Sequence, residues 1–211
     1  MDTDTASFLM LLNWMSPTFP IGSFAYSHGL EQAIADGSLS TQEDVEGWIS
    51  ELLQHGSGWN DAVIFAQCWH GNPNELALAL AGSAERYAET TQLGGNFNIA
   101  ASVWTGEESR ADIMAYPVAA GLACKRMNIP QELALSAFLQ GFCSSLVSVA
   151  VRLVPLGQTS GLKILRNLAP LISATAKRAV TATLDDLGSH CIAADIAAMQ
   201  HETLFTRIFR T

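Results

Sequence analysis

The feature that most restricts the fold is an apolar run from Leu133 to Val154, which ends at a proline. A run of this length can cross a membrane as a helix, or it can form the central helix of a helical core. The run contains six polar residues: Ser136, Gln140, Ser144, Ser145, Ser148 and Arg152. Because an arginine without a partner is costly inside a bilayer, the run predicts a buried core helix.

Helical spacing of apolar residues continues through the rest of the chain, whereas strand-type alternation is scarce. Helices are predicted over residues 6–15, 23–36, 59–69, 74–90, 97–104 and 192–200, with a break at 94–96. Ser40 and Glu43 have the spacing of a capping box and predict the start of another helix. We therefore expect an all-α fold, in which residues 1–211 form a single domain of about ten packed helices with a C-terminal contact tail at about 200–211.

The charges are distributed unevenly along the chain. Residues 1–110 carry 14 acids and 2 bases, whereas residues 111–211 carry 6 acids and 9 bases, for a net charge of −9. Nucleic-acid binding needs clustered Lys and Arg, so the acidic first half argues against it. The asymmetry suits docking to a charged protein surface, and an ordinary solvated acidic face would explain it equally well.

Two further features indicate a reducing compartment. The four cysteines form no C-x-x-C pair and lie in apolar helical contexts: Cys68, Cys124, Cys143 and Cys191. They are therefore expected to be small buried thiols and not a metal or disulfide site. The acidic first residues lack the positive region of a signal peptide, which predicts a cytoplasmic protein.

The stretch R-L-V-P-L-G-Q-T-S-G-L-K-I-L at 152–165 invites comparison with a phosphate-binding loop. Such a loop needs G-x-x-x-x-G-K-[ST] between a strand and a helix. Only three residues separate Gly157 from Gly161, Leu162 precedes Lys163, and Ile164 replaces the hydroxyl residue. The stretch is therefore interpreted as a junction between two helices.

Structural roles are assigned to four residues of this junction: Arg152, Pro155, Gly157 and Gly161. Pro155 is expected to end one helix, and Gly157 to supply backbone freedom. Thr159 or Ser160 is a candidate cap for the next helix, which should run toward Leu168 and resume after Pro170. Arg152 is expected to be at least half buried, either bonded to carbonyls at a helix end or contacting a partner.

No recognisable catalytic or metal motif is present. His201-Glu202 does not continue as H-E-x-x-H, because position 205 is Phe205. No G-x-S-x-G occurs, and the other histidines have no ligand spacing. We assign no catalytic residue, metal ligand or cofactor from the sequence.

Two segments have compositions suited to protein contact. Residues 19–31 are rich in aromatic and apolar groups and follow a proline-bounded turn. Residues 201–211 carry Leu, Ile, two Phe and two Arg, which are frequent interface anchors, although chain ends are usually polar. The second segment could also pack on its own domain, and the two interpretations are compatible.

Four segments in order give the chain a resemblance to UreF, the urease accessory protein family. They are F-P-I-G-S-F-A-Y-S-H-G-L-E at 19–31, Y-P-V-A-A-G-L at 116–122, R-L-V-P-L-G-Q-T-S-G at 152–161 and A-M-Q-H-E-T-L-F-T-R-I-F-R at 198–210. The resemblance implies an all-helical homodimer that is not an enzyme. It also implies that the chain binds UreD (UreH in some species), assembles through it with the GTPase UreG, and delivers nickel to apo-urease.

The resemblance also suggests which residues bind partners. In the family, the aromatic at the place of Phe24 and the arginine at the place of Arg207 are linked to ordering the C-terminal region and to recruiting partners. Four weaker candidates lie in the same two segments: Tyr26, Glu31, His201 and Phe209. His28 and Leu162 depart from residues common in the family, which leaves local contacts open. Two alternatives are a direct nickel carrier and a helical enzyme with an unrecognised site.

Overall fold

The computed structural model describes residues 3–106, 113–188 and 190–210. Thr211, the last residue of the predicted contact tail, lies outside them. The α-helices are α1 (Thr3–Trp14), α2 (Leu30–Ala35), α3 (Gln42–His55), α4 (Ser57–Gln67), α5 (Asn74–Ala79), α6 (Ala84–Thr105), α7 (Tyr116–Arg126), α8 (Gln131–Leu153), α9 (Gly157–Val180) and α10 (Ile192–His201). Two 3-10 turns are η1 (Ser23–Ala25) and η2 (Leu184–Asp186). The described residues contain no strand, so the predicted all-α class is confirmed.

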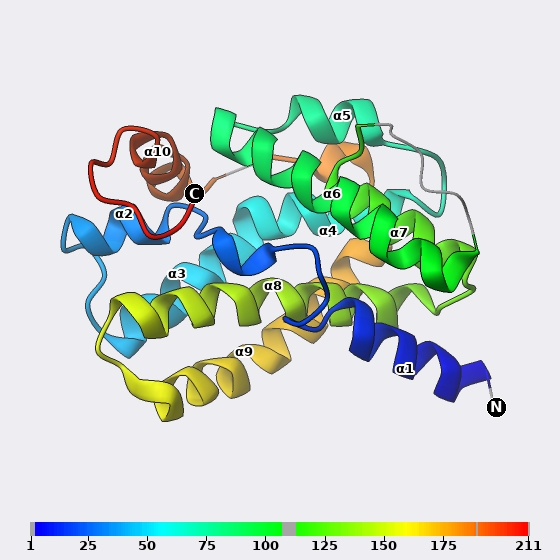
Figure 1. Ribbon diagram of the computed structural model, residues 1–211, viewed down its shortest axis with the longest axis horizontal. Coiled ribbons are helices and arrows are strands. Elements are labelled where there is room, and N and C mark those ends of the chain that lie inside the picture. Colours follow the sequence, from blue (N-terminus) through cyan, green and yellow to red (C-terminus); the bar gives the residue numbers. More distant parts are fainter. Residues whose placement is uncertain (1–2, 107–112, 189, 211) are drawn as a thin grey trace.

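The apolar run at 133–154 forms α8, which crosses the middle of the molecule (Figure 1). Helix α9 packs along one side of α8, and the pair α6 and α7 lies on its other side. By length and composition α8 could cross a membrane, but half of its most apolar window is buried against the other helices. Its length and apolarity are therefore explained by a central position in the core.

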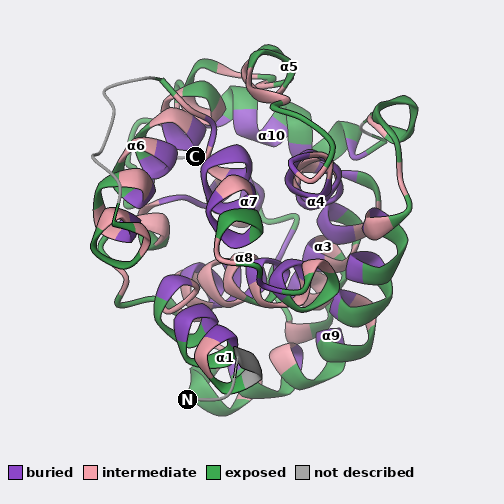
Figure 2. Ribbon diagram, turned by 90° about the vertical axis from the view of Figure 1, so that its right-hand side faces the viewer, coloured by how far each residue is buried: buried purple, intermediate pink, exposed green. Residues whose placement is uncertain are grey.

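One large core joins the helices, and their inward faces are the buried ones (Figure 2). Its largest fully buried side chains include Trp14, Phe65, Phe97, Leu30, Ile49, Leu53, Leu135 and Leu139. An edge-to-face contact between Trp14 and Phe97, with ring centroids 5.6 Å apart, joins α1 to α6. All four cysteines are buried thiols, as predicted.

The predicted helix at 23–36 is wrong in its first half. The chain forms the short turn η1, becomes extended at Tyr26, and then takes left-handed backbone angles at His28 (φ 51°) and Gly29 (φ 77°). Helix α2 starts only at Leu30. Two successive left-handed residues cannot belong to a right-handed helix, so apolar spacing alone misplaced this boundary. The predicted end is correct: Gly37 follows α2 with φ 82°.

The predicted break at 94–96 does not exist, and α6 runs through it. The chain breaks instead at residues 80–83, where the side chain of Ser83 caps α6 by accepting from the Arg86 N–H at 3.1 Å. Gly94 is buried where the backbone of Met114 crosses α6, so it serves close packing and not a turn. A glycine in a helix interior costs stability, which is why it resembled a break.

Three smaller predictions are also corrected. The capping box at the start of α3 uses Thr41 and Asp44, one residue later than predicted, and hydrogen bonds from Ser40 and Thr41 lower the pKa of Asp44. Helix α9 begins at Gly157 without a side-chain cap, so neither Thr159 nor Ser160 has that role. Helix α9 also continues through Pro170, which is exposed, so that water can reach the carbonyl left without its donor.

Candidate partner-docking site

The two segments predicted for protein contact lie side by side in the fold. Helix α10 packs on α2, and the segment that follows it, residues 202–210 (the tail), folds back over α2 and the start of α6 (Figure 1). The main chain of the tail reaches the first segment directly, because the Arg210 N–H donates to the Ala25 carbonyl at 2.7 Å. Residues separated by about 180 positions therefore form one surface.

The carboxylate of Glu31 holds the end of the tail. It is buried at the start of α2 and accepts from two successive tail amides, Ile208 N–H at 2.7 Å and Phe209 N–H at 2.9 Å. Hydrogen bonds to a charged acceptor are stronger than neutral ones, and a buried carboxylate without donors is costly. The tail therefore has one defined position, with the Phe209 side chain buried beneath it.

His201 connects Glu31 to a second carboxylate. Its ring is fully buried, with Nε2 2.9 Å from Glu31 Oε2 and Nδ1 2.8 Å from Glu85 Oε2. Ionised carboxylates only accept hydrogen bonds, so the imidazolium form, with two N–H donors, satisfies both contacts. Glu85 also accepts from Arg207 Nη1 at 2.6 Å, which adds the tail arginine to the same group. We call Glu31, Glu85 and His201 the tail clamp.

A second set of bonds holds the last described residue of the tail. Gln92 Oε1 accepts from both the Tyr26 hydroxyl and Arg210 Nη1, each at 2.9 Å. Burial raises the pKa of Tyr26, while the hydrogen bond with Arg210 opposes this rise. Between these groups and Arg207 lies a surface groove of about 350 Å³.

Large apolar side chains around the clamp point to solvent. Phe205 is fully exposed, Ile208 is 69% exposed, and Phe24 on η1 is 53% exposed. Helix α10 also exposes large apolar side chains, in an unusual pattern. It buries small residues, Ala194, Ala197 and Ala198, and exposes large ones, Ile192, Ile196 and Met199. This is the reverse of the pattern expected for a helix on a protein surface.

The structure separates the predicted partner-binding residues into two groups. Phe24 and Arg207 are exposed, whereas Tyr26, Glu31, His201 and Phe209 are buried. The exposed pair is accessible to a partner. The buried four hold the tail in place, and the prediction that they contact a partner directly is not supported by their positions.

The predicted structural residues lie away from this site, at the junction of α8 and α9. Gly157 has φ 73°, and a Cβ on Gly161 would come within 2.9 Å of Val151, so both positions suit glycine. Helix α8 ends just before Pro155, as predicted. Arg152 is exposed, contrary to the prediction, because the buried face of α8 carries Leu146, Val147, Val149 and Ala150 and leaves position 152 outside.

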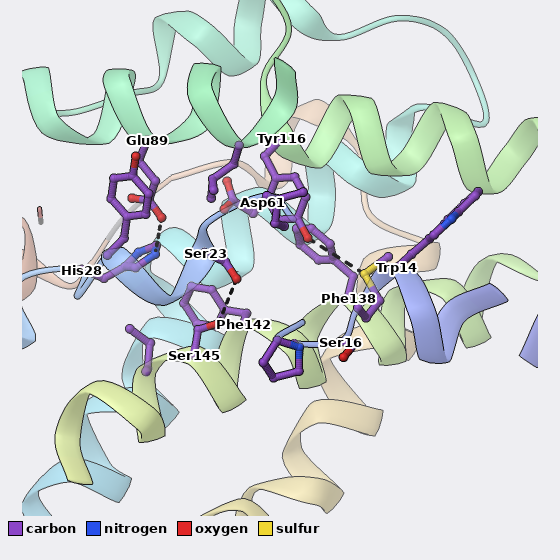
Figure 3. A pocket seen from close by; sticks show the side chains of 17 residues that line it. Trp14, Ser16, Ser23, His28, Asp61, Glu89, Tyr116, Phe138, Phe142 and Ser145 are labelled. Atoms are coloured by element: carbon purple, nitrogen blue, oxygen red, sulfur yellow. Dashed lines mark hydrogen bonds and ion pairs between the residues drawn. The ribbon is translucent and has the colours of Figure 1, made fainter. Parts of the chain in front are cut away.

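Sequence reasoning missed a cluster of polar and charged side chains that are buried or half-buried, which we call the buried cluster: His28, Ser57, Asp61, Arg86 and Glu89. His28 Nδ1 lies 3.0 Å from Ser57 Oγ. His28 Nε2 lies 3.0 Å from Glu89 Oε1 (Figure 3). Arg86 pairs with Glu89 and with Asp61. These residues come from three places in the chain, the turn before α2 (His28), α4 (Ser57 and Asp61) and α6 (Arg86 and Glu89), and they have no motif spacing, so little in the sequence indicates that they meet.

The pKa values in the buried cluster are set mainly by burial and by Arg86, the one permanent cation of the cluster. Burial raises the pKa of Glu89, but Arg86 and His28 outweigh it and hold that pKa at about 2. For Asp61 burial prevails over the attraction of Arg86, and its pKa is raised. Among the described residues, no group of three or more His, Cys, Asp or Glu side chains is arranged to hold a metal ion.

Comparison with known proteins identifies the family of the chain. A family model described as UreF matches residues 39–169. The urease accessory protein UreF of Roseobacter denitrificans is 43% identical over 214 residues, covering 98% of this chain and 95% of that protein. The urease accessory protein UreF of Agrobacterium fabrum is 44% identical over 220 residues, covering 100% and 99%. The chain belongs to the UreF family.

Membership in the UreF family supports a role in urease maturation. The tail clamp residues Glu31 and His201 lie outside the part that the family model matches. They lie inside the alignment with the Agrobacterium fabrum UreF, which covers the whole chain. The resemblance predicted from the four sequence segments is thereby confirmed.

Proposed function

We propose that this UreF-family chain is a non-enzymatic scaffold of urease maturation. It binds UreD (or UreH) and, through that partner, the GTPase UreG, and the assembly inserts nickel into apo-urease. We further propose that it works in the cytoplasm as a homodimer, without a cofactor. These partners come from the family resemblance, and the exposed apolar side chains of α10 and the tail support the proposal that partners bind there.

The observation that carries the proposal is the reversed amphipathicity of α10. Surface helices normally turn their large apolar residues to the core, whereas α10 turns Ile192, Ile196 and Met199 to solvent. Exposed apolar patches mark protein interaction sites. The fixed tail also exposes Phe205 and Ile208, and Arg207 adds an arginine, a frequent interface anchor.

The test is light scattering after size-exclusion chromatography of the chain mixed with UreD, with UreG and with both. Ile196→Asp should abolish the complex with UreD, because it places a charge in the apolar contact. Ile99→Asp is the matched control, since Ile99 is an exposed isoleucine on α6, 61% exposed against 45% for Ile196. Loss of the complex in both variants, or in neither, would contradict the assignment of α10 as the contact.

Arg207→Ala tests the tail separately. Arg207 is 42% exposed and pairs with Glu85, so its loss should cost the fold less than about 1 kcal/mol. Recruitment of UreG to the complex should weaken by at least about tenfold, as expected for an interface arginine. Arg166→Ala removes an exposed arginine far from the tail and serves as control. Equal losses of thermal stability and of binding would argue for a purely structural role.

One observation bears on the enzyme alternative. Ser57, His28 and Glu89 form a hydroxyl–imidazole–carboxylate chain beside a cavity of about 280 Å³. Arg86 lies 3.3 Å from the same His28 nitrogen and pairs with the same Glu89, so it competes for the carboxylate that would orient the base. We expect the original chain to hydrolyse p-nitrophenyl acetate no faster than the Ser57→Ala variant does. Turnover that Ser57→Ala removes would favour the enzyme.

A further inference from the structure

The tail clamp and the buried cluster are built on the same two short pieces of backbone. One piece carries His28 of the buried cluster and, three residues later, Glu31 of the tail clamp. The other is the first turns of α6, where Glu85 belongs to the tail clamp and the adjacent Arg86 to the buried cluster. A displacement of the backbone in either piece would therefore move side chains of both groups.

The first of these pieces is held in a conformation that depends on α10. His28 has φ 51°, which is uncommon for a residue with a side chain, and Gly29 has φ 77°. Helix α10 lies so close to Gly29 that an added Cβ would be 2.9 Å from both the Ala194 carbonyl oxygen and the Ala198 nitrogen. The left-handed turn therefore persists because α10 packs on one side and His28 is bonded on the other.

The buried cluster separates two cavities. The smaller one, about 50 Å³, lies on the side of Tyr116 and Phe138 (Figure 3). The larger one, about 280 Å³, lies on the side of Ser83 and α10. Both are bordered by His28 and Asp61, which therefore lie between them, whereas Glu89, the partner of His28, borders only the smaller cavity.

We propose that the tail clamp and the buried cluster form one conformational switch. When the tail leaves Glu31 and α10 leaves Gly29, the turn at 27–29 relaxes out of its left-handed conformation. His28 then separates from Glu89, and the two cavities join. A partner that holds or releases the tail would thereby change the interior of the chain without contacting it, because the tail clamp and the buried cluster are built on the same two pieces of backbone.

The inference is tested on the purified chain alone, so it does not depend on the proposed partners. Nuclear magnetic resonance of protein labelled with ¹⁵N-histidine reports the imidazole of His28, whose signals are assigned by their loss in His28→Gln. Deletion of residues 203–211 and the single change Glu31→Gln should each shift the His28 ring signals. Glu75→Gln, the same charge change at an exposed position, should leave them unchanged.

Because coupling between two sites is reciprocal, the switch must also work in the opposite direction. His28→Gln should speed hydrogen exchange of the Ile208 and Phe209 amides, the two that Glu31 accepts, by at least about fivefold. Glu31→Gln should speed hydrogen exchange of the same two amides directly, and this increase would show that the tail is released. Unchanged His28 signals in a chain whose tail is released, or unchanged tail exchange in His28→Gln, would overturn the proposal.

Discussion

Helix α10 can pack closely on Gly29 because this residue has no side chain. Gly29→Ala would place a methyl group 2.9 Å from two backbone atoms of α10, at a left-handed φ of 77°. Backbone cannot move aside as a flexible side chain can. We expect the free energy of unfolding to fall by about 3 kcal/mol, of which about 1 kcal/mol is left-handed strain.

Gly37→Ala is the matched control for this change. Gly37 has a similar φ of 82°, but a Cβ there would have no neighbour within 4 Å. Only the strain of about 1 kcal/mol should appear. Urea unfolding followed by circular dichroism measures both variants, and equal losses would show that α10 does not constrain Gly29.

The residues of the tail clamp illustrate what sequence can supply at this scale. Glu31 and His201 stood in segments that composition and family resemblance both marked, so their importance was predictable. Their role was not, because it depends on a contact between residues 170 positions apart. The exposed Arg152 was mispredicted for a related reason: an apolar run predicts a buried helix but not which of its faces reaches solvent.

At the scale of elements, two adjacent glycines in α6 should respond in opposite ways. A Cβ on Gly94 would come within 2.0 Å of the Met114 carbonyl oxygen, whereas one on Gly95 would meet nothing within 4 Å. Gly94→Ala should therefore destabilise the fold by about 2 kcal/mol or more, because α6 and the segment before α7 must separate. Gly95→Ala should stabilise it by about 0.5–1 kcal/mol by raising helix propensity.

Thermal unfolding of the two alanine variants beside the original chain provides the measurement. A melting temperature that falls for Gly94→Ala and rises for Gly95→Ala is the expected pair. A fall of similar size in both would mean that α6 needs flexibility at 94–95, as the predicted break had assumed. The prediction failed because two adjacent glycines are found both in turns and in helices that another segment crosses closely.

The element boundaries that were predicted correctly are those marked by local chemistry. Pro155 and Gly37 end their helices through constraints that act within a few residues, and sequence shows such constraints directly. The turn at 27–29 and the uninterrupted α6 depend on α10 and on Met114, which are distant in sequence. Sequence therefore predicted the class of the fold and many helix ends, but not the joints on which the candidate site is built.

At the scale of the whole molecule, buried titratable groups should make stability fall at both ends of the pH range. On the alkaline side, burial raises the pKa of Cys68 to about 12 and that of Cys191 to about 11. In the unfolded chain the pKa of a cysteine thiol is about 8.5. Above that pH the unfolded state releases protons that the folded state keeps. Each such thiol then lowers stability by up to about 1.4 kcal/mol per pH unit.

Urea unfolding between pH 7 and 10, in the presence of a reductant, measures the alkaline limb. Cys68→Ala should lower stability at pH 7, because it leaves a small cavity in the core. It should also make the decline above pH 8.5 shallower, because one of the thiols responsible has been removed. An unchanged slope would mean that another group, and not this thiol, releases the proton.

On the acid side the group responsible is Glu89. Although burial raises its pKa, the charges of Arg86 and His28 hold it at about 2, against about 4.3 in the unfolded chain. The stability that ionised Glu89 contributes is present above about pH 4.3 and is lost as the pH falls toward 2. Asp61 acts in the opposite direction, because burial raises its pKa and its neutral form suits the fold.

The variant Glu89→Gln should unfold more easily at pH 7 than the original chain. It should also lose less stability between pH 4.5 and 2, because it lacks the carboxylate that becomes protonated. If both proteins decline in parallel over that range, Glu89 is not the group that links the interior of the molecule to pH.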